Sequence, residues 1–410
     1  MASSPESPAP TTPVPIETVG AVFLVFLRLG LSSFGGPVAH LGYFRAEFVE
    51  RRRWLGEASY ADLVALCQFL PGPASSQVGM ALGLMRRGYA GALAAWAGFT
   101  LPSAVLLILL ALGIAGHSAA LPPAALYGLK LVAVAVVAQA VWGMARTLCT
   151  DAPRVAMMAL ACGVALRVPG AFGQLGVIAA AGAVGLLRLR PAAAADHAPL
   201  PIAVGRRAGV AWLVLFCVLL LGLPALLEAL PSQGLAEAAA FYRSGALVFG
   251  GGHVVLPLLQ AAVVSPGWVD KDVFLAGYGA AQAVPGPLTT FAAFLGASMR
   301  GAPSGWLGGL VCLVAIFAPS FLLVAGALPF WERLRRQRRT RAALMGVNAA
   351  VVGLLLAALY RPVCTSAIER PADIGVVVVA YLALARWRLP PWLVVLACGV
   401  AGWLLGPGAA

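Results

Sequence analysis

Two Pro-Gly-Pro motifs lie inside apolar stretches, and each is followed by a pair of hydroxyl residues. The motif residues are Pro71, Gly72, Pro73, Ser75 and Ser76 in one copy, and Pro285, Gly286, Pro287, Thr289 and Thr290 in the other. Proline suits the first turn of a helix, because its missing N–H would have no partner there. A half-helix beginning at each motif presents unpaired N–H groups and hydroxyls, which with the helix dipole form an anion site. A structural kink is the alternative interpretation.

Three further sets of residues accompany the motifs in both copies. They are the amides Gln68 and Gln282, the glycine turns with Gly35, Gly36, Gly250 and Gly251, and the arginines Arg28 and Arg243. The amides add donors, and the glycines allow close approach of a ligand or of a neighbouring helix. An arginine in an apolar stretch either faces a cavity, where two guanidinium groups bind a divalent oxyanion, or snorkels to the interface. Together with the motifs, these residues are the candidate substrate-binding set.

Other polar residues carry weaker signals. Lys130 and Asn348 lie in equivalent apolar stretches and line the pathway, unless the lysine snorkels. His40 and His253 are expected in loops. The sequence has no catalytic Ser/His/Asp order, no Walker loop and no His or Cys spacing that suits a metal. We therefore expect neither an enzyme nor a metal or other cofactor.

The composition predicts an integral membrane protein. Of 410 residues, 61% are hydrophobic and only 10% are charged, and the mean hydropathy is +0.91. Apolar stretches at 90–115, 126–145, 212–230 and 307–330 approach the roughly 20 residues that cross a bilayer. The net charge of +13 comes from basic residues in short connections, which is typical of cytoplasmic loops and not of nucleic-acid binding.

The chain contains an internal repeat. Residues 26–36 match 241–251, Trp54 matches Trp268, 68–73 match 282–287, 101–103 match 318–320, and Gly128 matches Gly346. The shared order of these motifs indicates two related halves. We expect a disordered tail at 1–16, an N-terminal transporter repeat at 17–190, a linker with an extra transmembrane helix at 191–230, and a C-terminal repeat at 231–410.

The loop charges predict that the two repeats are inverted. Around the Pro-Gly-Pro motifs, the first half carries more flanking arginines than the second half. In the connection that follows, the second half carries the excess, because residues 331–341 contain six arginines. Because Lys and Arg stay on the cytoplasmic side, equivalent loops face opposite sides. For its flanking arginines to share one side, segment 57–85 must enter and leave on that side, so we interpret 57–85 and 273–299 as paired half-helices or re-entrant hairpins. An ordinary kinked span is the alternative. The predicted fold is an all-α polytopic membrane protein of two inverted repeats with broken helices and about 9 to 12 crossings.

The long motifs also resemble a known family. The run FLRLGLSSFGGPVAHLGYFRAEFVERRRWLGEASYADLVALCQFLPGPASSQVGMALG, with FGGGHVVLPLLQ, AQAVPGP and GVNAAVVGLLLAALY, is similar to the chromate ion transporter family in its long two-domain form. The resemblance covers nearly the whole chain. It implies a multi-pass protein of the inner (plasma) membrane, a secondary transporter that exports chromate and confers resistance in bacteria.

The resemblance leaves the substrate and the mechanism open among related alternatives. Sulfate is a tetrahedral dianion of similar size, so a sulfate transporter is one alternative. A passive oxyanion channel and a non-transporting membrane subunit or intramembrane enzyme are the others. The expected partners are chromate or a sulfate-like oxyanion and the lipid bilayer, with no nucleic acid, and a homo-oligomer is compatible with the sequence.

Overall fold

The computed structural model describes residues 18–34, 36–116, 123–168, 171–191, 200, 204–248 and 255–405. These residues form helices and connecting turns, with no β-strand among them. The predicted tail and the candidate residues Gly35, Gly250 and Gly251, as well as His253, lie outside the described residues. The all-α class predicted from the sequence is confirmed.

The first repeat contains seven α-helices and one π-helical segment among its described residues. They are α1 (Val19–Ser32), α2 (Gly36–Arg45), η1 (Ala46–Arg51), α3 (Glu57–Phe69), α4 (Ala74–Gly116), α5 (Pro123–Leu148), α6 (Ala152–Arg167) and α7 (Ala171–Arg188). Helix α8 (Arg206–Ala229) follows and has no counterpart in the first repeat.

The second repeat contains corresponding helices in the same order, together with additional short segments, among the residues described. They are α9 (Gln233–Ala246), α10 (Val255–Val263), α11 (Lys271–Ala281), η3 (Leu288–Thr290), α12 (Phe291–Ala297), α13 (Gly305–Ala327), η4 (Leu328–Phe330), α14 (Trp331–Arg336), α15 (Arg338–Ala358), η5 (Leu359–Cys364), α16 (Thr365–Ala367), α17 (Pro371–Ala385) and α18 (Pro391–Leu405). Helix α9 corresponds to α1, α11 to α3, α15 to α5, and the pair α17–α18 to α6–α7.

Short polar side chains start several helices. Thr18, Asp151 and Ser232 each accept a hydrogen bond from the backbone N–H three residues later, at 3.1, 3.0 and 3.3 Å. Each satisfies one of the amides that the first turn leaves without an intrahelical acceptor. Helix formation then satisfies the remaining backbone groups, as a lipid environment requires.

Helix α4 is not one continuous rod. Its backbone leaves helical geometry at Gly88, where φ is 59° and ψ is −152°. A Cβ atom on Gly83 would lie only 2.2 Å from the Gly91 carbonyl oxygen, so the chain reverses and the two parts pack against each other. Residues 74–86 therefore form a half-helix, and residues 89–116 form the span that follows it.

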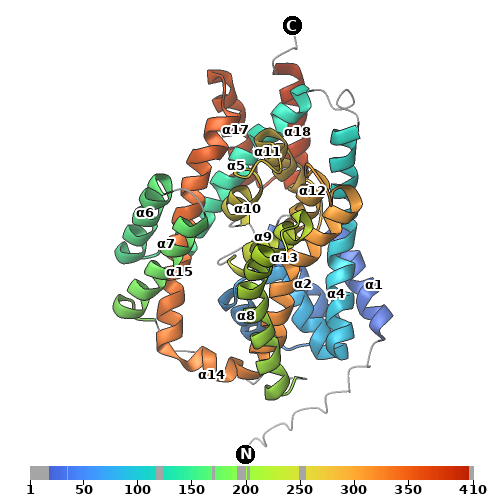
Figure 1. Cartoon of the computed structure of the whole chain (residues 1–410), viewed down its shortest axis with the longest axis vertical. Helices are drawn as coiled ribbons and strands as arrows, with labels where there is room; N and C mark the ends of the chain where they lie inside the picture. Colours follow the sequence, from blue (N-terminus) through green and yellow to red (C-terminus); the bar gives the residue numbers. More distant parts are fainter. Residues whose placement is uncertain are drawn as a thin grey trace, which may run out of the picture.

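The ends of each Pro-Gly-Pro segment meet. The Arg86 guanidinium lies 5.2 Å from the centroid of the Trp54 ring, and the equivalent Arg300 amide donates to the Trp268 carbonyl oxygen at 3.0 Å. Each segment thus enters and leaves on one side, as predicted for a re-entrant pair of half-helices. In Figure 1, α2, which precedes the first pair, lies below α11 and α12 of the second pair.

In each repeat, one long helix packs on the last two helices of the other repeat. Helix α5 lies against α17 and α18, and α15 lies against α6 and α7 (Figure 1). A Cβ on Gly128 of α5 would lie 2.0 Å from the Cys398 carbonyl oxygen, and one on Gly346 of α15 would lie 2.1 Å from that of Ala181. Gly128 and Gly346 are matched positions, so the repeats are interlocked by equivalent contacts. This is the arrangement of two inverted repeats.

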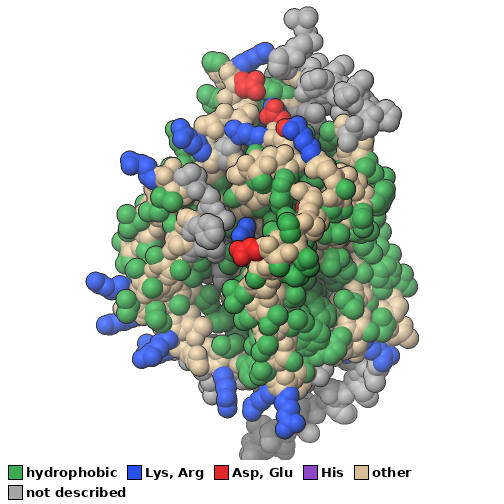
Figure 2. Space-filling model, viewed as in Figure 1, with side chains coloured by type: hydrophobic (Ala, Val, Ile, Leu, Met, Phe, Trp, Pro, Cys, Tyr) green, Lys and Arg blue, Asp and Glu red, His purple; other side chains and the backbone are tan. Residues whose placement is uncertain are grey.

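Several helices are long and apolar enough to cross a membrane. Among the described residues they are Ala74–Ile114, which holds the reversal at Gly88, Tyr127–Leu148, Arg206–Ala229, Gly305–Phe330 and Arg338–Ala367, and shorter apolar helices accompany them. Figure 2 shows apolar side chains over most of the visible face, with Lys and Arg side chains along its lower and left edges and, together with Asp and Glu, near its upper end. Helix α14 lies at the lower end in Figure 1.

Candidate anion site at the crossing of the two chain breaks

The two Pro-Gly-Pro breaks are joined to the opposite repeats. The Gly72 amide donates to the Val248 carbonyl oxygen at 2.5 Å, and the Gly286 amide donates to the Ser33 carbonyl oxygen at 2.9 Å. Ser33 and Val248 are equivalent residues, because they are 215 positions apart, which is the offset between the matched segments 26–36 and 241–251. Each break is therefore held by the chain that precedes the glycine turn of the other repeat.

Both motif glycines need to be glycine. Their φ angles are +131° at Gly72 and +97° at Gly286, a region that side chains with a Cβ rarely adopt. A Cβ on Gly72 would also lie 2.4 Å from the Ser320 hydroxyl oxygen, and one on Gly286 would lie 3.0 Å from that of Ser103. Ser103 and Ser320 are again equivalent residues. The breaks, α4 and α13 thus meet in a reciprocal arrangement.

A helical segment begins after each break, as predicted. Helix α4 begins at Ala74, and η3 begins at Leu288 and continues into α12. The first-turn amides of such a segment have no intrahelical acceptor and favour an anion. The amides of Gly72 and Gly286 themselves bond to the opposite repeat, so they are not the free donors that the motif suggests. The remaining donors are the first-turn amides and nearby side chains.

Several side-chain atoms around the breaks are buried and lack a hydrogen-bond partner within the described part of the chain. The atoms are the hydroxyl oxygens of Ser33, Ser76, Thr289 and Ser320, Oε1 of Gln77, Nε2 of Gln282 and Nε2 of His40. An unpaired polar group costs about 1–3 kcal/mol when buried in a protein. The four hydroxyl groups and the Gln282 amide can donate to an anion bound among them, whereas Oε1 of Gln77 can only accept a hydrogen bond. We call these seven residues the polar cluster.

The remaining hydroxyls and amides near the breaks have internal partners. Ser75 lies 3.4 Å from Nδ1 of His40, and Thr290 donates to the Pro287 carbonyl oxygen at 2.7 Å. Gln77 donates through Nε2 to the Pro71 carbonyl oxygen at 2.7 Å and so braces the first break. His40 belongs to α2 and is buried, so the expectation that it lies in a loop is wrong.

Arg28 lies on the face of α1 that does not pack against neighbouring helices. Its side chain is exposed on the same side of α1 as Leu24 and Leu31, which are 62% and 57% exposed. A basic residue between two exposed leucines is typical of a snorkelling side chain. The equivalent Arg243 of α9 is half-buried. The two guanidinium groups therefore have different surroundings.

The other sequence candidates also divide between the two repeats. Gln68 is exposed on α3, whereas its counterpart Gln282 is half-buried and belongs to the polar cluster. Pro73 and Pro287 are buried behind the breaks, and Gly36 begins α2. Pro71 and Pro285 are half-buried.

Sequence reasoning missed part of the polar cluster. Ser33, Gln77 and Ser320 were not among the candidates, and neither was Ser103. The signal for Ser103 and Ser320 was present in the sequence, because each follows a proline at matched positions 102 and 319 of the repeats. Ser33 likewise belongs to a matched segment, but only its contact with the other repeat shows its place.

The comparisons with known proteins agree with this architecture. The chromate transporter family matches residues 20–186 and 235–403. A chromate transport protein of Pseudomonas aeruginosa is 30% identical over 94% of this chain and 92% of its own length. One of Cupriavidus metallidurans is 26% identical over 99% of both, and a probable chromate transport protein of Synechococcus elongatus is 27% identical over 92% and 93%. No solved structure matches the chain. This chain belongs to the chromate transporter family.

Proposed function

We propose that this protein is a secondary transporter that moves chromate out of the cell across the cytoplasmic membrane and thereby confers chromate resistance. The observation that carries the proposal is the polar cluster at two reciprocal helix breaks between inverted repeats. Relatives that are named chromate transport proteins and align with this chain over almost its full length support the substrate.

The chemistry of the polar cluster suits a tetrahedral dianion. Ser76 and Thr289 are buried hydroxyl donors, one beside each break. The first turns of α4 and of η3 add backbone N–H groups and the positive ends of their dipoles. Hydroxyl and amide donors bind an oxyanion without a proton transfer, so the substrate can be released unchanged on the other side.

Burial favours a carrier over a passive channel. Gln77, Ser33 and Ser320 are fully buried in the structure, so an anion reaches them only when the surrounding helices move. Inverted repeats supply such a movement by rocking of one repeat against the other. The carrier mechanism is therefore the favoured alternative.

Sulfate transport is the second candidate function. Sulfate offers the same four oxygen acceptors as chromate, and hydroxyl donors discriminate weakly between two acceptors of like shape and charge. The same polar cluster would hold either ion.

The test is uptake of labelled chromate into inside-out membrane vesicles, with sulfate as competitor and with or without a pH gradient. We expect saturable uptake that exceeds that of vesicles without the protein. Uptake of sulfate in preference to chromate would identify sulfate as the substrate, and flux that never saturates would support a channel. Vesicles with no flux of either anion would contradict the proposal.

A further inference from the structure

Helices α3 and α11 occupy equivalent positions in the two repeats but have different neighbours. Helix α11 packs against α5 of the other repeat, and a Cβ on Gly279 would lie 2.3 Å from the Leu129 carbonyl oxygen. Leu275, one turn earlier, is fully buried. The equivalent positions on α3 are Ala61 and Ala65, and both are exposed. The same helix face is therefore covered in one repeat and open in the other.

Helices α5 and α15 are equivalent in the two repeats, and each is held by the same kind of contact. Helix α5 approaches α18 at Gly128, and α15 approaches α7 at Gly346, with nearly the same closeness. The difference between the repeats therefore lies in α3 and α11 and not in the position of α5 or α15 on the partner hairpins.

An ion pair joins α11 to α5 on the covered side. Lys130 Nζ lies 2.9 Å from Asp272 Oδ1 and 3.9 Å from Glu369 Oε1, and the lysine side chain is only 10% exposed. In the other repeat, Asn348 takes the place of Lys130 and Ala58 that of Asp272. Oδ1 of Asn348 is buried without a partner among the described residues. The covered side is therefore fastened by charge, and the open side has no equivalent pair.

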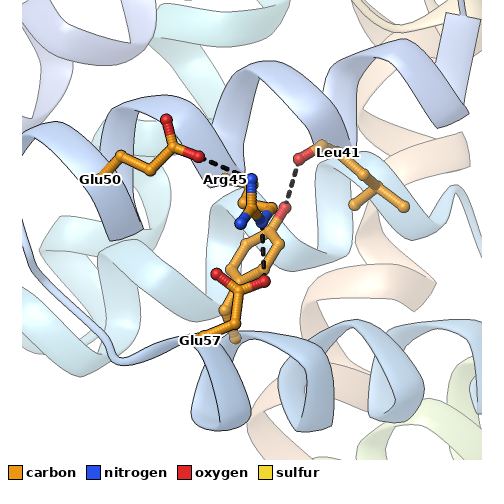
Figure 3. Close-up of polar contacts among 5 residues, drawn as sticks. Leu41, Arg45, Glu50 and Glu57 are labelled. Atoms are coloured by element: carbon orange, nitrogen blue, oxygen red, sulfur yellow. Dashed lines mark hydrogen bonds and ion pairs between the residues drawn. The ribbon is translucent and has the colours of Figure 1, made fainter.

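The open face of α3 does not result from loose attachment of the helix. Figure 3 shows Arg45 of α2 between Glu50 and Glu57, with nitrogen–oxygen distances of 2.6 and 2.7 Å. Tyr60 also donates to the Leu41 carbonyl oxygen at 2.7 Å. Helix α3 is therefore fastened to α2 on one side while its opposite face stays free.

We propose that this structure is one of two alternating arrangements. In the other arrangement, α11 leaves α5, the Lys130–Asp272 ion pair breaks, and the face of α3 that carries Ala61 and Ala65 packs on α15 beside Asn348. The inference rests on the proposed transport function and deepens it by naming the two moving helices. Related sequences in inverted positions make the packed contact available to either repeat, so the two arrangements are close in free energy.

This exchange gives the polar cluster access to one side of the membrane at a time. Helix α3 leads directly to the break at Gly72, and α11 leads to the break at Gly286. Movement of either helix therefore uncovers its own break. When α11 moves, Lys130 loses its nearer carboxylate partner, Asp272, and its ammonium group attracts a dianion to the opening. Lys130 is in this view a positioning residue for anion capture.

The first test uses a bulky side chain on the open face. In Ala65→Trp the indole lies on an exposed surface in the present arrangement, so the protein folds, but the indole prevents packing on α15. We expect chromate flux in proteoliposomes to fall at least about 10-fold, because one of the two states is blocked. Ala211→Trp is the matched control, since Ala211 is exposed on α8, and its flux should stay within about twofold of wild type. Wild-type flux in Ala65→Trp would overturn the proposal.

A cross-linking test does not depend on tolerance of tryptophan. Ala58→Cys with Asn348→Cys places thiols at positions equivalent to the ion pair, in a Cys217→Ser background because Cys217 is the exposed native thiol among those described. We expect a short bifunctional thiol reagent to join the two cysteines within one chain. Adding Lys130→Met should raise the joining rate by about 2- to 5-fold, as expected for loss of a partly exposed ion pair. No joining, or joining only between two chains, would overturn the proposal, and the second result would make the α3 face an oligomer interface.

The two hypotheses fail in different ways. Wild-type protein that moves no chromate refutes the proposed function. Wild-type and Ala65→Trp proteins that move chromate equally well leave the function standing and refute the exchange of α3 and α11.

Discussion

Two neighbouring threonines give a sharp test of the polar cluster. Thr289 and Thr290 are both buried after the second break, but only Thr290 has a partner, the Pro287 carbonyl oxygen at 2.7 Å. The Thr289 hydroxyl has none within the described residues. Thr289→Val and Thr290→Val each replace a hydroxyl by a methyl group of similar size. The two variants therefore separate a hydroxyl kept for a ligand from one kept for the fold.

The effects on stability should have opposite signs. Thr289→Val removes a buried hydroxyl whose lack of a partner costs about 1–3 kcal/mol, so the free energy of unfolding should stay unchanged or rise. Thr290→Val removes a made hydrogen bond, while the Thr290 amide still donates to the Pro287 carbonyl oxygen at 3.0 Å, so stability should fall by about 0.5–1.5 kcal/mol. The apparent Tm of the purified protein without substrate should be lower for Thr290→Val than for Thr289→Val, by about 1 °C per kcal/mol of difference in a chain of this length.

The effects on transport should be reversed. A hydrogen bond to a charged partner contributes about 1.5–3 kcal/mol, so loss of the Thr289 donor should raise the chromate concentration for half-maximal flux about 10- to 100-fold. Thr290→Val should change it less than about threefold, because its hydroxyl already bonds to the backbone. Flux of labelled chromate into proteoliposomes measures both, and Thr289→Ser is the rescue control.

One combination of results would refute the assignment. If Thr289→Val lowers the apparent Tm as much as Thr290→Val does and moves chromate with unchanged affinity, the Thr289 hydroxyl has a structural role. The polar cluster would then have to be reassigned without it.

Further predictions concern the arginines and the break glycines. Arg243→Ala should reduce chromate affinity by roughly 10-fold, because this half-buried cation is placed to contact the anion. Arg28→Ala should leave flux within about twofold, because Arg28 snorkels. Equal losses in both variants would indicate that the two arginines bind the anion together. Gly72→Ala should abolish most flux and destabilise the protein by about 2–6 kcal/mol, since it adds backbone strain to the displacement of neighbouring polar groups. Gly301→Ala has a similar φ of +102° with no atom within 4 Å, so it should cost only the strain, about 1–3 kcal/mol, and thermal unfolding of the pair checks the difference.

Much of the local architecture was predictable because it depends on short segments. Proline and glycine restrict the backbone wherever they occur, so the breaks at Gly72 and Gly286 followed from the motifs alone. The loop charges predicted re-entrant segments, and the contacts of Arg86 with Trp54 and of Arg300 with Trp268 show that the segment ends meet. The number of full crossings stays a prediction.

The composition of the site was less predictable. Arg28 and Arg243 look alike in the sequence, yet one lies among exposed leucines and the other is half-buried. His40 looked like a loop residue, but burial beside Ser75 gives it a place in the polar cluster. In each case the neighbours come from distant parts of the chain, and a local pattern does not contain them.

The sequence by itself determined that the chain is embedded in a membrane, that it contains a repeat, and where the two backbone breaks lie. Composition decides the first, and the backbone preferences of a few residues decide the last. Only the tertiary structure decided that Gly72 bonds to Val248, that Gly286 bonds to Ser33, and that α11 is covered while α3 is open. These are contacts between repeats, and their partners are about as far apart in sequence as the repeats themselves. Packing free energy over the whole molecule selects such partners, and no single segment specifies them.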